Sequence, residues 1–442
     1  MPPPLTWTDL PGRKIGVWGV GVEGRAALRK LRALGVVPVL VDDAPATEPV
    51  DGLEVLPTVA GGLDALLACD VVIKSPGISV YGDEFRRLAG AGVRVAGALD
   101  LWLSESSSRR VVGVVGTKGK STTASILGAL LTGLGYKCFV GGNLGVPPYD
   151  PAAPDDADYW VIEISSFQVK SLTTAPRVVA LTSLHPDHLD WHRDAATYFA
   201  DKLSICSKPG AGLVVANGDD ELIQQYRHLM GDRVRWVHAV DEAPAWIDAL
   251  GLLGSHNVLN ALIARACLDA LGVEATDESL LAAAGNFKPL ESRLRLVGRV
   301  DGVDFLDDSL STNVLPTIAA LSSFEGRRVA LLVGGMDRGI EYGGLAEFLN
   351  RRQASTLVLA LPQNGDRIAS ELRQALRSPE VEIRQCSNLV EAVPLAHKWS
   401  RPEGVVLLSP AAPSFGLYRN YRDRAEQFLA AAVSVDGFEP VG

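Results

Sequence analysis

A glycine-rich, basic loop separates two apolar segments in the middle of this 442-residue chain. The apolar run at 111–115 predicts a buried strand, and the apolar spacing over 121–134 predicts a helix. Backbone N–H groups of such a loop can cradle phosphates, while a lysine reaches the outer phosphate oxygens and a hydroxyl holds Mg²⁺. The loop departs from the general P-loop pattern, since Val114 stands where that pattern has its first glycine. We favour ATP binding over a basic turn without function, through Gly116, Thr117, Lys118, Gly119, Lys120, Ser121 and Thr122.

Three blocks of the sequence each begin with a strand-like run, near residues 14, 111 and 303. Apolar strands alternate with helical patterns inside each block, which predicts parallel sheets covered by helices on both faces. A polar stretch at 104–110 predicts the first linker, and a second boundary falls near 288–300. We therefore expect an α/β protein of three domains. These are a Rossmann-like domain at 1–105, a central P-loop ATPase domain at 106–295 and a second Rossmann-like domain at 296–442.

The charge balance argues against two large classes of partner. The formal net charge is −10, whereas general nucleic-acid and membrane-surface binders need clustered positive charge. Residues 1–13 lack the order of a signal peptide, and no apolar run approaches the ~18 residues of a membrane span. The five scattered cysteines have no metal-type spacing and suit a reducing compartment. We expect a cytoplasmic monomer that acts on small molecules and binds neither nucleic acid nor membrane.

A second glycine-rich turn, GVGVEG, lies near the N-terminus at 19–24. It follows a predicted strand and opens a predicted helix, and an aspartate stands at the end of the next strand. Glycines let the backbone approach a ligand there, and the helix N-terminus attracts phosphate. Any nucleoside diphosphate presents that group, so a redox dinucleotide is not required. The turn predicts a nucleotide site at Gly19, Gly21, Val22, Glu23 and Asp42, with a ligand-free strand–helix turn as the alternative.

Further motifs, in one order along the chain, resemble those of the Mur ligases. The motifs similar to the central domain of that family are GTKGKSTT (116–123), GGNLG (141–145), EISSFQ (163–168), HPDHLDWH (185–192) and GSHNVLNA (254–261). Those similar to the glutamate-adding members are VIKSPGIS (72–79), DDSLSTN (307–313), GGMDRG (334–339) and LSPAAPSFGLYRNY (408–421). The resemblance implies an ATP-dependent ligase that joins glutamate to UDP-N-acetylmuramoyl-L-alanine for peptidoglycan synthesis.

The resemblance also implies which side chains meet the two nucleotides. Besides the phosphate loop, the implied ATP contacts are Asn257, Asn260, Arg293 and Asp308. The implied contacts with the uridine substrate, besides the N-terminal turn, are Ser75, Asn143, Ser165 and Gln168. Plainer interpretations stay open. The asparagines can cap a turn or a helix, and Arg293 with Asp308 can be an ordinary surface ion pair.

Four residues are implied in metal binding, of which three, together with Lys120, form the implied catalytic set. Glu163 ends an apolar strand beside the phosphate loop, where a carboxylate can ligate Mg²⁺, although a strand-end acid also fits. For His188, composition alone fits a metal site and a solvated loop equally well. Lys202 looks like a surface helix lysine by its own chemistry, but it matches the lysine that the family carbamylates. The implied ligands of two Mg²⁺ ions are Ser121, Glu163, His188 and Lys202, and the implied catalytic residues are Lys120, Glu163, His188 and Lys202.

The third domain is implied to hold the amino acid, through Thr312, Arg338, Ser414 and Tyr421. A guanidinium can pair with one carboxylate while hydroxyls donate to the other. Leu310 stands where the family has lysine, and PSFG at 413–416 replaces its run of small residues. With the unusual turn at 18–24, these departures narrowly favour L-glutamate over D-glutamate as the substrate.

The implied reaction forms an acyl phosphate from ATP and a carboxylate, which the amine of glutamate then attacks. Three other functions compete with it. An NAD-dependent oxidoreductase accounts for GVGVEG but leaves the ATP loop unexplained, and a non-catalytic nucleotide-binding regulator would bind ATP without turnover. A folylpolyglutamate synthase shares the last two domains but generally lacks the Rossmann-like block before the phosphate loop.

Overall fold

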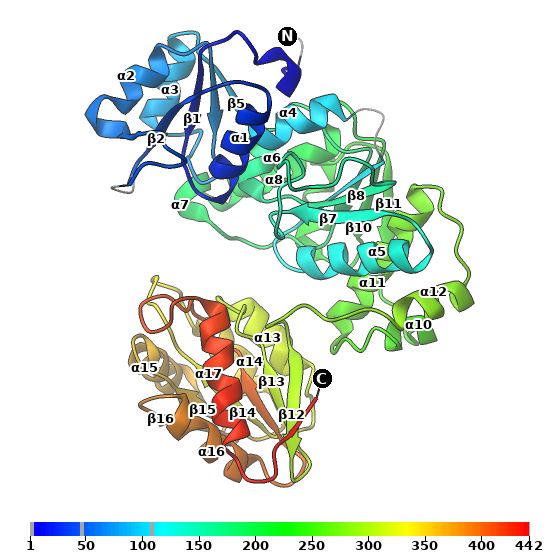
Figure 1. Ribbon diagram of the computed structural model, residues 1–442. Helices are drawn as coiled ribbons and strands as arrows, with labels where there is room; N and C mark the ends of the chain where they lie inside the picture. The colour runs from blue at the N-terminus through cyan, green and yellow to red at the C-terminus, as the bar shows by residue number, and fades with distance from the viewer. Residues whose placement is uncertain (1–3, 45–47, 107–109, 442) are drawn as a thin grey trace. The chain divides into compact units, whose positions relative to one another are not determined.

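The computed structural model describes residues 4–44, 48–106 and 110–441, which form three separate β-sheets flanked by helices (Figure 1). The expected α/β class in three sheets is therefore confirmed. The chain divides into two compact units: residues up to Leu250 with Asn257–Phe287, and Gly251–His256 with the residues from Lys288 onward. The second unit thus includes a short segment, Gly251–His256, that lies within the predicted central domain. Of the predicted linker at 104–110, the first two residues end a helix, and 107–109 lie outside the described residues.

The first sheet is fully parallel, in the order β3-β2-β1-β4-β5. Its strands are β1 (Ile15–Trp18), β2 (Val39–Asp42), β3 (Val55–Pro57), β4 (Val71–Lys74) and β5 (Arg94–Gly97). Its helices are α1 (Val22–Ala33), α2 (Leu63–Leu67), α3 (Asp83–Gly90) and α4 (Ala98–Glu105). The strand order reverses between β1 and β4, which is where open α/β sheets bind ligands. The GVGVEG turn follows β1 at that point.

The central sheet is also fully parallel, in the order β11-β10-β9-β6-β8-β7. Its strands are β6 (Val111–Val115), β7 (Cys138–Gly142), β8 (Tyr159–Glu163), β9 (Val178–Leu181), β10 (Leu213–Asn217) and β11 (Val234–Val237). Its helices are α5 (Lys120–Gly133), α6 (Ser166–Ser171), α7 (Leu189–His192), α8 (Ala195–Leu203), α9 (Glu221–Gln225), α10 (Ala245–Asp248), α11 (Ser255–Ala270) and α12 (Asp277–Ala284). Strands β6, β8 and β9 are buried throughout, so their sequences are continuous apolar runs. The loops that carry the candidate site residues follow the carboxyl ends of these three strands.

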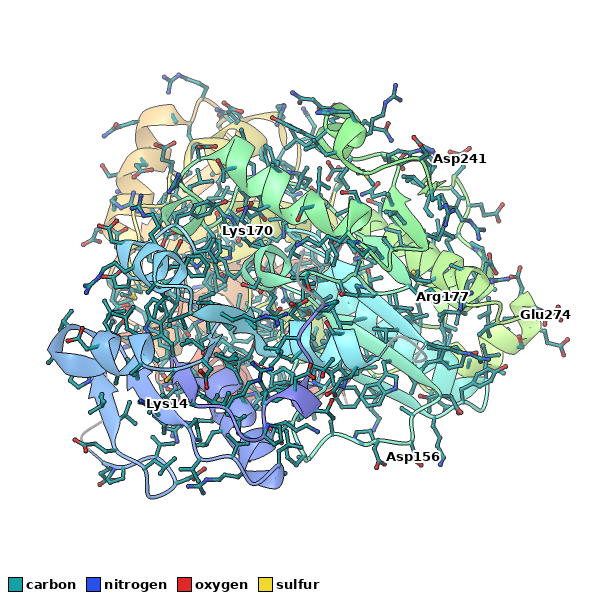
Figure 2. The ribbon with its side chains drawn as sticks, turned by 90° about the horizontal axis from the view of Figure 1, so that it is seen from above. Lys14, Asp156, Lys170, Arg177, Asp241 and Glu274 are labelled. Carbon is teal, nitrogen blue, oxygen red and sulfur yellow. The ribbon has the colours of Figure 1, made fainter. Side chains whose placement is uncertain are left out.

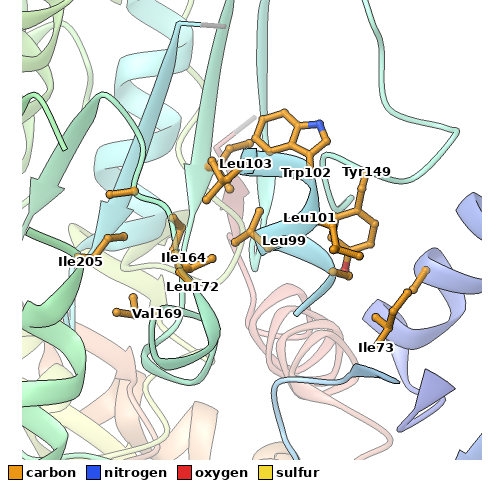
Figure 3. Close-up of a cluster of buried hydrophobic side chains, with 14 of the residues drawn as sticks. Ile73, Leu99, Leu101, Trp102, Leu103, Tyr149, Ile164, Val169, Leu172 and Ile205 are labelled. Carbon is orange, nitrogen blue, oxygen red and sulfur yellow. The ribbon is translucent and has the colours of Figure 1, made fainter. Parts of the chain in front are cut away.

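One hydrophobic core joins the first two sheets into a single unit. Figure 3 shows the α4 side chains Leu99, Leu101, Trp102 and Leu103 between Ile73 of β4 and the central-domain residues Ile164, Val169 and Leu172. The rings of Trp102 and Trp160 lie 5.1 Å apart between centroids. Charged side chains such as Asp156, Asp241 and Glu274 project outward from this unit (Figure 2). Shared apolar burial therefore holds the GVGVEG turn and the phosphate loop in one compact unit.

The third sheet has seven strands in the order β16-β15-β14-β17-β13-β12-β18. They are β12 (Arg295–Val300), β13 (Val303–Asp307), β14 (Val329–Val333), β15 (Thr356–Ala360), β16 (Val381–Gln385), β17 (Val405–Leu408) and β18 (Glu439–Pro440). The helices are α13 (Val314–Ser322), α14 (Gly343–Arg351), α15 (Gly365–Ala375), α16 (Leu389–Ser400) and α17 (Tyr421–Val433). The expectation of a purely parallel sheet is wrong here, because β12 runs antiparallel to β13 and β18. Asp301 and Gly302 both have positive φ and form a two-residue hairpin turn, which requires antiparallel neighbours.

Three short 3-10 segments, at Trp7–Asp9, Ser204–Ser207 and Arg227–Leu229, and one π-helical segment at Thr58–Gly62 complete the described elements. Among the helices in the described part of the chain, none combines the length and the apolar character that a membrane span requires.

Candidate active site

The phosphate loop is shaped by two glycines with positive φ, Gly116 at 145° and Gly119 at 85°. A β-carbon on Gly116 would lie 2.1 Å from Thr182 Oγ1, and one on Gly119 would lie 2.5 Å from Asn260 Oδ1. Neither position has room for a side chain. Helix α5 starts directly after Gly119, and no side chain of the described residues caps its N-terminus. This leaves the positive end of the helix dipole available to a phosphate.

Hydrogen bonds hold the loop in shape without a ligand. The backbone N–H groups of Thr117 and Lys118 donate to the carbonyl and the hydroxyl of Ser183, each at 2.8 Å. The hydroxyl of Thr117 donates to His185 O at 3.0 Å, and Lys120 Nζ donates to Thr117 O at 3.0 Å. The buried Thr117 side chain therefore braces the loop. A preformed loop binds its phosphates without a folding cost.

The carboxylate of Glu163 is the centre of the site, at the end of β8 and only 2% exposed. Ser121 Oγ donates to Glu163 Oε2 at 2.6 Å, and Asn143 Nδ2 donates to Glu163 Oε1 at 2.7 Å. The three residues, far apart in the sequence, are thus brought together beside the phosphate loop. A carboxylate and a hydroxyl oxygen are the donors that Mg²⁺ prefers. Among the described residues, no group of three or more His, Cys, Asp and Glu side chains forms a complete cation site.

Lys202 lies beneath the phosphate loop, not on the surface as its own chemistry would suggest. Its side chain is buried, at 2% exposed, and its Nζ donates to Gly116 O at 2.8 Å. Burial lowers the pKa of Lys202 well below that of an ordinary lysine, and the charge of Lys120 lowers it further. The carboxylates of Asp187 and Glu163 oppose that shift. A neutral amine is therefore accessible in the middle of the site.

His188 lies at the mouth of the same site, directly before α7. Its backbone is left-handed, with φ 51°, and its side chain is about half exposed, at 52%. Its ring centroid lies 4.8 Å from that of Phe167, and its Nε2 lies 3.9 Å from Asp187 Oδ1. Burial lowers the pKa of His188, which favours the neutral imidazole that a metal ion needs. Among the described residues, His188 contacts the ring of Phe167 and the carboxylate of Asp187, so its binding of a metal ion stays a prediction.

Asn257 and Asn260 are buried on one face of α11. Asn260 Nδ2 donates to Asn257 Oδ1 at 3.0 Å, and Asn260 Oδ1 accepts from Thr123 Oγ1 at 3.2 Å. These bonds tie α11 to the helix that carries the phosphate loop. The pair supports the loop whether or not it also faces adenine.

The N-terminal turn is braced from both neighbouring strands. Ser75 Oγ, after β4, donates to Gly19 O at 2.7 Å. Asp42 Oδ2, at the end of β2, accepts from Val20 N at 2.6 Å. Gly19 has φ 89°, whereas Gly21 has open space around it and Val22 is 73% exposed. Ser75 and Asp42 thus shape the turn, and its exposed outer edge is left for a ligand.

Glu23 points away from that edge and into the central domain. Its carboxylate accepts from Gln168 Nε2 at 2.7 Å and from Tyr149 OH at 3.0 Å. Burial raises the pKa of Glu23 to about 7, and burial lowers the pKa of the neighbouring Lys74 to about 8. Ser165 caps α6 in a reciprocal box with Gln168. Glu23, Gln168 and Ser165 therefore join the two domains of the first unit.

The Glu23→Gln substitution is expected to change how the stability of this unit depends on pH. The folded-state pKa of about 7 lies above the ordinary 4.5, so the wild type loses stability as the pH rises through that window. Glutamine does not titrate, and the variant should gain about 3 kcal/mol relative to the wild type between pH 4.5 and 7, at about 1.4 kcal/mol per pKa unit. Thermal unfolding across this range measures the difference. The exposed Glu274→Gln serves as the control, and parallel curves for all three proteins would contradict the expectation.

In the second unit, Asp308 is buried and does not form a surface ion pair. Its carboxylate accepts from Leu294 N at 3.1 Å, from Ser409 Oγ at 2.8 Å and from Ser311 Oγ. Burial raises its pKa to about 6, while the charge of Arg293 acts to lower it. Asp308 therefore fixes the loop after β13.

The four residues predicted to grip glutamate come from adjacent parts of one sheet edge. Thr312 follows β13, Arg338 follows β14, and Ser414 follows β17, which lies between those two strands. Met336 N donates to Pro413 O at 2.8 Å and links two of the loops. Tyr421 is the first residue of α17. The parallel register brings these loops to the same edge, as a shared pocket requires.

A buried network beside Lys202 was not predicted from the sequence. Asp201 Oδ2 bonds His192 Nδ1 at 2.8 Å and accepts from Tyr81 OH at 2.7 Å, while its Oδ1 pairs with Lys170 Nζ at 2.8 Å. Lys170 is labelled near the middle of Figure 2. The third histidine of HPDHLDWH, His192, was the only sequence signal for the network. This network connects α8, which carries Lys202, to the first domain.

Comparison with known proteins identifies both later domains. Residues 114–248 match the Mur ligase middle domain, and residues 292–412 match the Mur ligase glutamate ligase domain. The chain is 38% identical to the UDP-N-acetylmuramoyl-L-alanine--L-glutamate ligase of Micromonospora sp., over 97% of this chain and 98% of the relative. The enzyme of that name from Salinispora tropica is also 38% identical, over 97% and 99% of the two chains.

Solved structures share the fold. UDP-N-acetylmuramate-alanine ligase MurC from Thermotoga maritima matches with a TM-score of 0.56 at 20% identity, over 96% of this chain and 99% of MurC. Folylpolyglutamate synthase from Mycobacterium tuberculosis matches with a TM-score of 0.53 at 15% identity, over 71% of this chain and 91% of the synthase. At these sequence identities the solved structures support only the assignment of the fold. The relatives that align over nearly the full length decide the matter: the chain belongs to the Mur ligase family of ATP-dependent amino-acid ligases.

Proposed function

We propose that this enzyme joins L-glutamate to UDP-N-acetylmuramoyl-L-alanine and converts ATP to ADP and phosphate, in the cytoplasmic synthesis of peptidoglycan precursors. The observation that carries the proposal is the cluster of Ser121, Asn143 and Glu163 beside the preformed phosphate loop. It supplies a carboxylate, a hydroxyl and a helix N-terminus where a triphosphate and its cation need them. The names of the near full-length relatives support the two substrates.

The donor set fits Mg²⁺ together with substrate. Ser121 and Glu163 would hold one ion with the phosphates of ATP, since Mg²⁺ sites usually combine one or two carboxylates with substrate oxygens. His188 and a carbamylated Lys202 would hold a second. Bound cations neutralise the charge that develops on the transferred phosphoryl group. Two ions and the carbamate are part of the proposal.

The residues of the phosphate loop position ATP for transfer. Lys120 and the first N–H groups of α5 would bind the phosphate oxygens. The carboxylate of the acceptor attacks the γ-phosphorus, and ADP leaves. The amine of glutamate then attacks the acyl carbon, the C–O bond to phosphate breaks, and an amide and phosphate result. Positioning and charge neutralisation account for most of the catalysis in such transfers.

The acceptor nucleotide is assigned to the first domain. The exposed edge formed by Gly21 and Val22 at the start of α1 would receive the diphosphate. Asn143 extends from the same unit toward the reacting carboxyl group. The Glu23 contacts hold the turn against the central domain, so the nucleotide and the phosphate loop keep a fixed separation.

The third domain is assigned to glutamate, through Thr312, Arg338, Ser414 and Tyr421. Arg338 is exposed and free to pair bidentately with a carboxylate, whereas Ser414 lies at the buried floor. Leu310 and the PSFG segment at 413–416 distinguish this pocket from that of D-glutamate enzymes. Together with the relatives' names, they favour the L-isomer.

Phosphate release with ATP, Mg²⁺ and the acceptor tests the proposal, with L-glutamate and D-glutamate compared side by side. We expect release with L-glutamate at a kcat/KM at least about 100-fold above that with the D-isomer, because a misplaced amine loses that much rate. Release with only D-glutamate would reverse the stereochemical assignment. The absence of release with both isomers would remove the assigned acceptor.

A further inference from the structure

A fully buried arginine links the loops of the amino-acid domain. Arg424, on α17, is 0% exposed and is one of the largest fully buried side chains of the described chain. Its Nη2 donates to Ser309 O at 2.7 Å, and its Nη1 donates to Ala412 O at 3.1 Å and to Gly334 O at 3.4 Å. All three acceptors are backbone carbonyls. A single guanidinium therefore ties three separate loops to one helix.

The three loops are the ones that carry the proposed glutamate contacts. Ser309 lies three residues before Thr312, Gly334 four residues before Arg338, and Ala412 two residues before Ser414. The fourth contact, Tyr421, begins the helix that holds the guanidinium. The loops follow β13, β14 and β17, which are neighbours in the sheet. Each side chain of the proposed pocket is thus within a few residues of an Arg424 anchor.

Only a guanidinium suits this position. It carries five donors in a rigid planar fork, whereas an ammonium group is a compact charge that cannot reach three separated carbonyls. Burial lowers the pKa of Arg424 to about 10, and the charges of Asp307 and Asp308 help to keep it protonated. A buried cation without a directly paired carboxylate is costly, and such costs persist mainly where a function requires them.

The space around the guanidinium is filled. A β-carbon on Gly335 would lie 2.2 Å from Pro413 O and 3.1 Å from Arg424 Nη1. The guanidinium carbon of Arg424 also lies over the ring of Tyr418, 5.9 Å from its centroid. The loops therefore cannot shift toward one another, and any change at Arg424 transmits to all of them.

We propose that Arg424 is a positioning residue of the amino-acid site, which sets the relative placement of Thr312, Arg338 and Ser414 and so the affinity and chirality of glutamate binding. This inference rests on the proposed function. Discrimination between glutamate isomers depends on the direction of one amine relative to two gripped carboxylates. That geometry is fixed by the distances between the loops, and the guanidinium sets these distances.

The test compares Arg424→Lys with the wild type and with Arg422→Lys, an exposed control two residues away on the same helix. The first readout is glutamate-dependent phosphate release. The second replaces glutamate with hydroxylamine, which attacks the acyl phosphate to give a hydroxamate and phosphate and needs no amino-acid pocket. We expect Arg424→Lys to raise the KM for glutamate at least about tenfold and to narrow the preference between isomers. Its hydroxamate formation and the behaviour of Arg422→Lys should stay within about threefold of the wild type.

The outcomes separate this inference from the function it rests on. An unchanged KM for glutamate in Arg424→Lys would overturn it, and so would an equal loss of both reactions, which indicates a general structural role. If the wild type forms hydroxamate but shows no glutamate-dependent phosphate release, the proposed amino-acid site is refuted together with this inference. A wild type that forms no hydroxamate would instead refute the ligase chemistry.

A measurement on the wild type covers the case in which Arg424→Lys fails to fold. Hydrogen exchange is followed as glutamate is added with the acceptor and a non-hydrolysable ATP analogue. We expect peptides over 309–313, 334–340 and 412–416 to gain protection at the same glutamate concentration, because one group couples them. Protection confined to one loop would overturn the proposal.

Discussion

Replacing Lys120 with alanine is expected to reduce turnover by about 10³-fold or more, while the affinity for the uridine nucleotide stays unchanged. Lys120 is the first residue of α5, and it would place its ammonium on the outer phosphates. Alanine keeps the helix but removes the charge that stabilises the developing negative oxygens. The GVGVEG turn belongs to a different sheet of the same unit. Initial rates and equilibrium binding of the acceptor, measured on the same preparation, check both parts.

The exposed Lys137→Ala provides a matched control in the same domain. Lys137 pairs only with acidic residues at the edge of the central sheet, so its loss should leave both rate and binding unchanged. Full activity in Lys120→Ala would refute the role of the phosphate loop. Parallel loss of acceptor binding would show that the substitution damages the unit as a whole.

The fold was predictable where the pattern is continuous and buried. Strand β6 matches the strand predicted at 111–115, because it is an apolar run enclosed on both faces. Edge strands were missed. Strand β16 alternates apolar with charged residues, and β7 ends in two glycines, which weakens the strand signal. Strand β12 follows from the Asp301–Gly302 turn, a signal that was present in the sequence but not used.

In the candidate active site, too, sequence reasoning anticipated some features and missed others. Ser121, Asn143 and Glu163 come from three of the predicted motifs, and the structure brings them together because parallel strands end at the same edge of the sheet. Family membership also removes the oxidoreductase alternative that GVGVEG had left open. Glu23 was expected to contact nucleotide, yet its carboxylate lies on Gln168, 145 residues away, a pairing that no local pattern contains.

Arg424 shows why long-range contacts escape sequence reasoning. Its helix contains the polar stretch RDRAEQ, which is typical of an exposed surface. Its acceptors lie 12, 90 and 115 residues away, and all are backbone carbonyls that carry no side-chain signal. Lys202 posed the same difficulty, because only the family resemblance distinguished it from a solvated helix lysine.

Replacing Lys202 with methionine is expected to reduce turnover by about 10³-fold without unfolding the unit. Burial lowers the pKa of this amine well below that of an ordinary lysine, and the charges of Lys120 and Lys118 lower it further. A neutral amine can add CO₂ and release a proton, which replaces an unwelcome third cation with an anion. That anion is a ligand for Mg²⁺, whereas methionine offers no oxygen. Growth of a carbamate resonance in ¹³C NMR with labelled bicarbonate, and its absence in Lys202→Met, is the direct measurement.

The Lys208→Met variant is the control that separates loss of the Lys202 carbamate from the loss of a buried lysine in general. Burial lowers the pKa of Lys208 to about 8, yet its Nζ donates to two backbone carbonyls at the end of α6, away from the phosphate loop. We expect Lys208→Met to lose thermal stability while it keeps the carbamate resonance and its response to CO₂. The wild type should lose activity in CO₂-depleted buffer and regain it on addition of bicarbonate. Full wild-type activity without CO₂, with unfolding of Lys202→Met, would make Lys202 a structural donor to Gly116 and leave Ser121 and Glu163 as the only protein ligands of the proposed cation site.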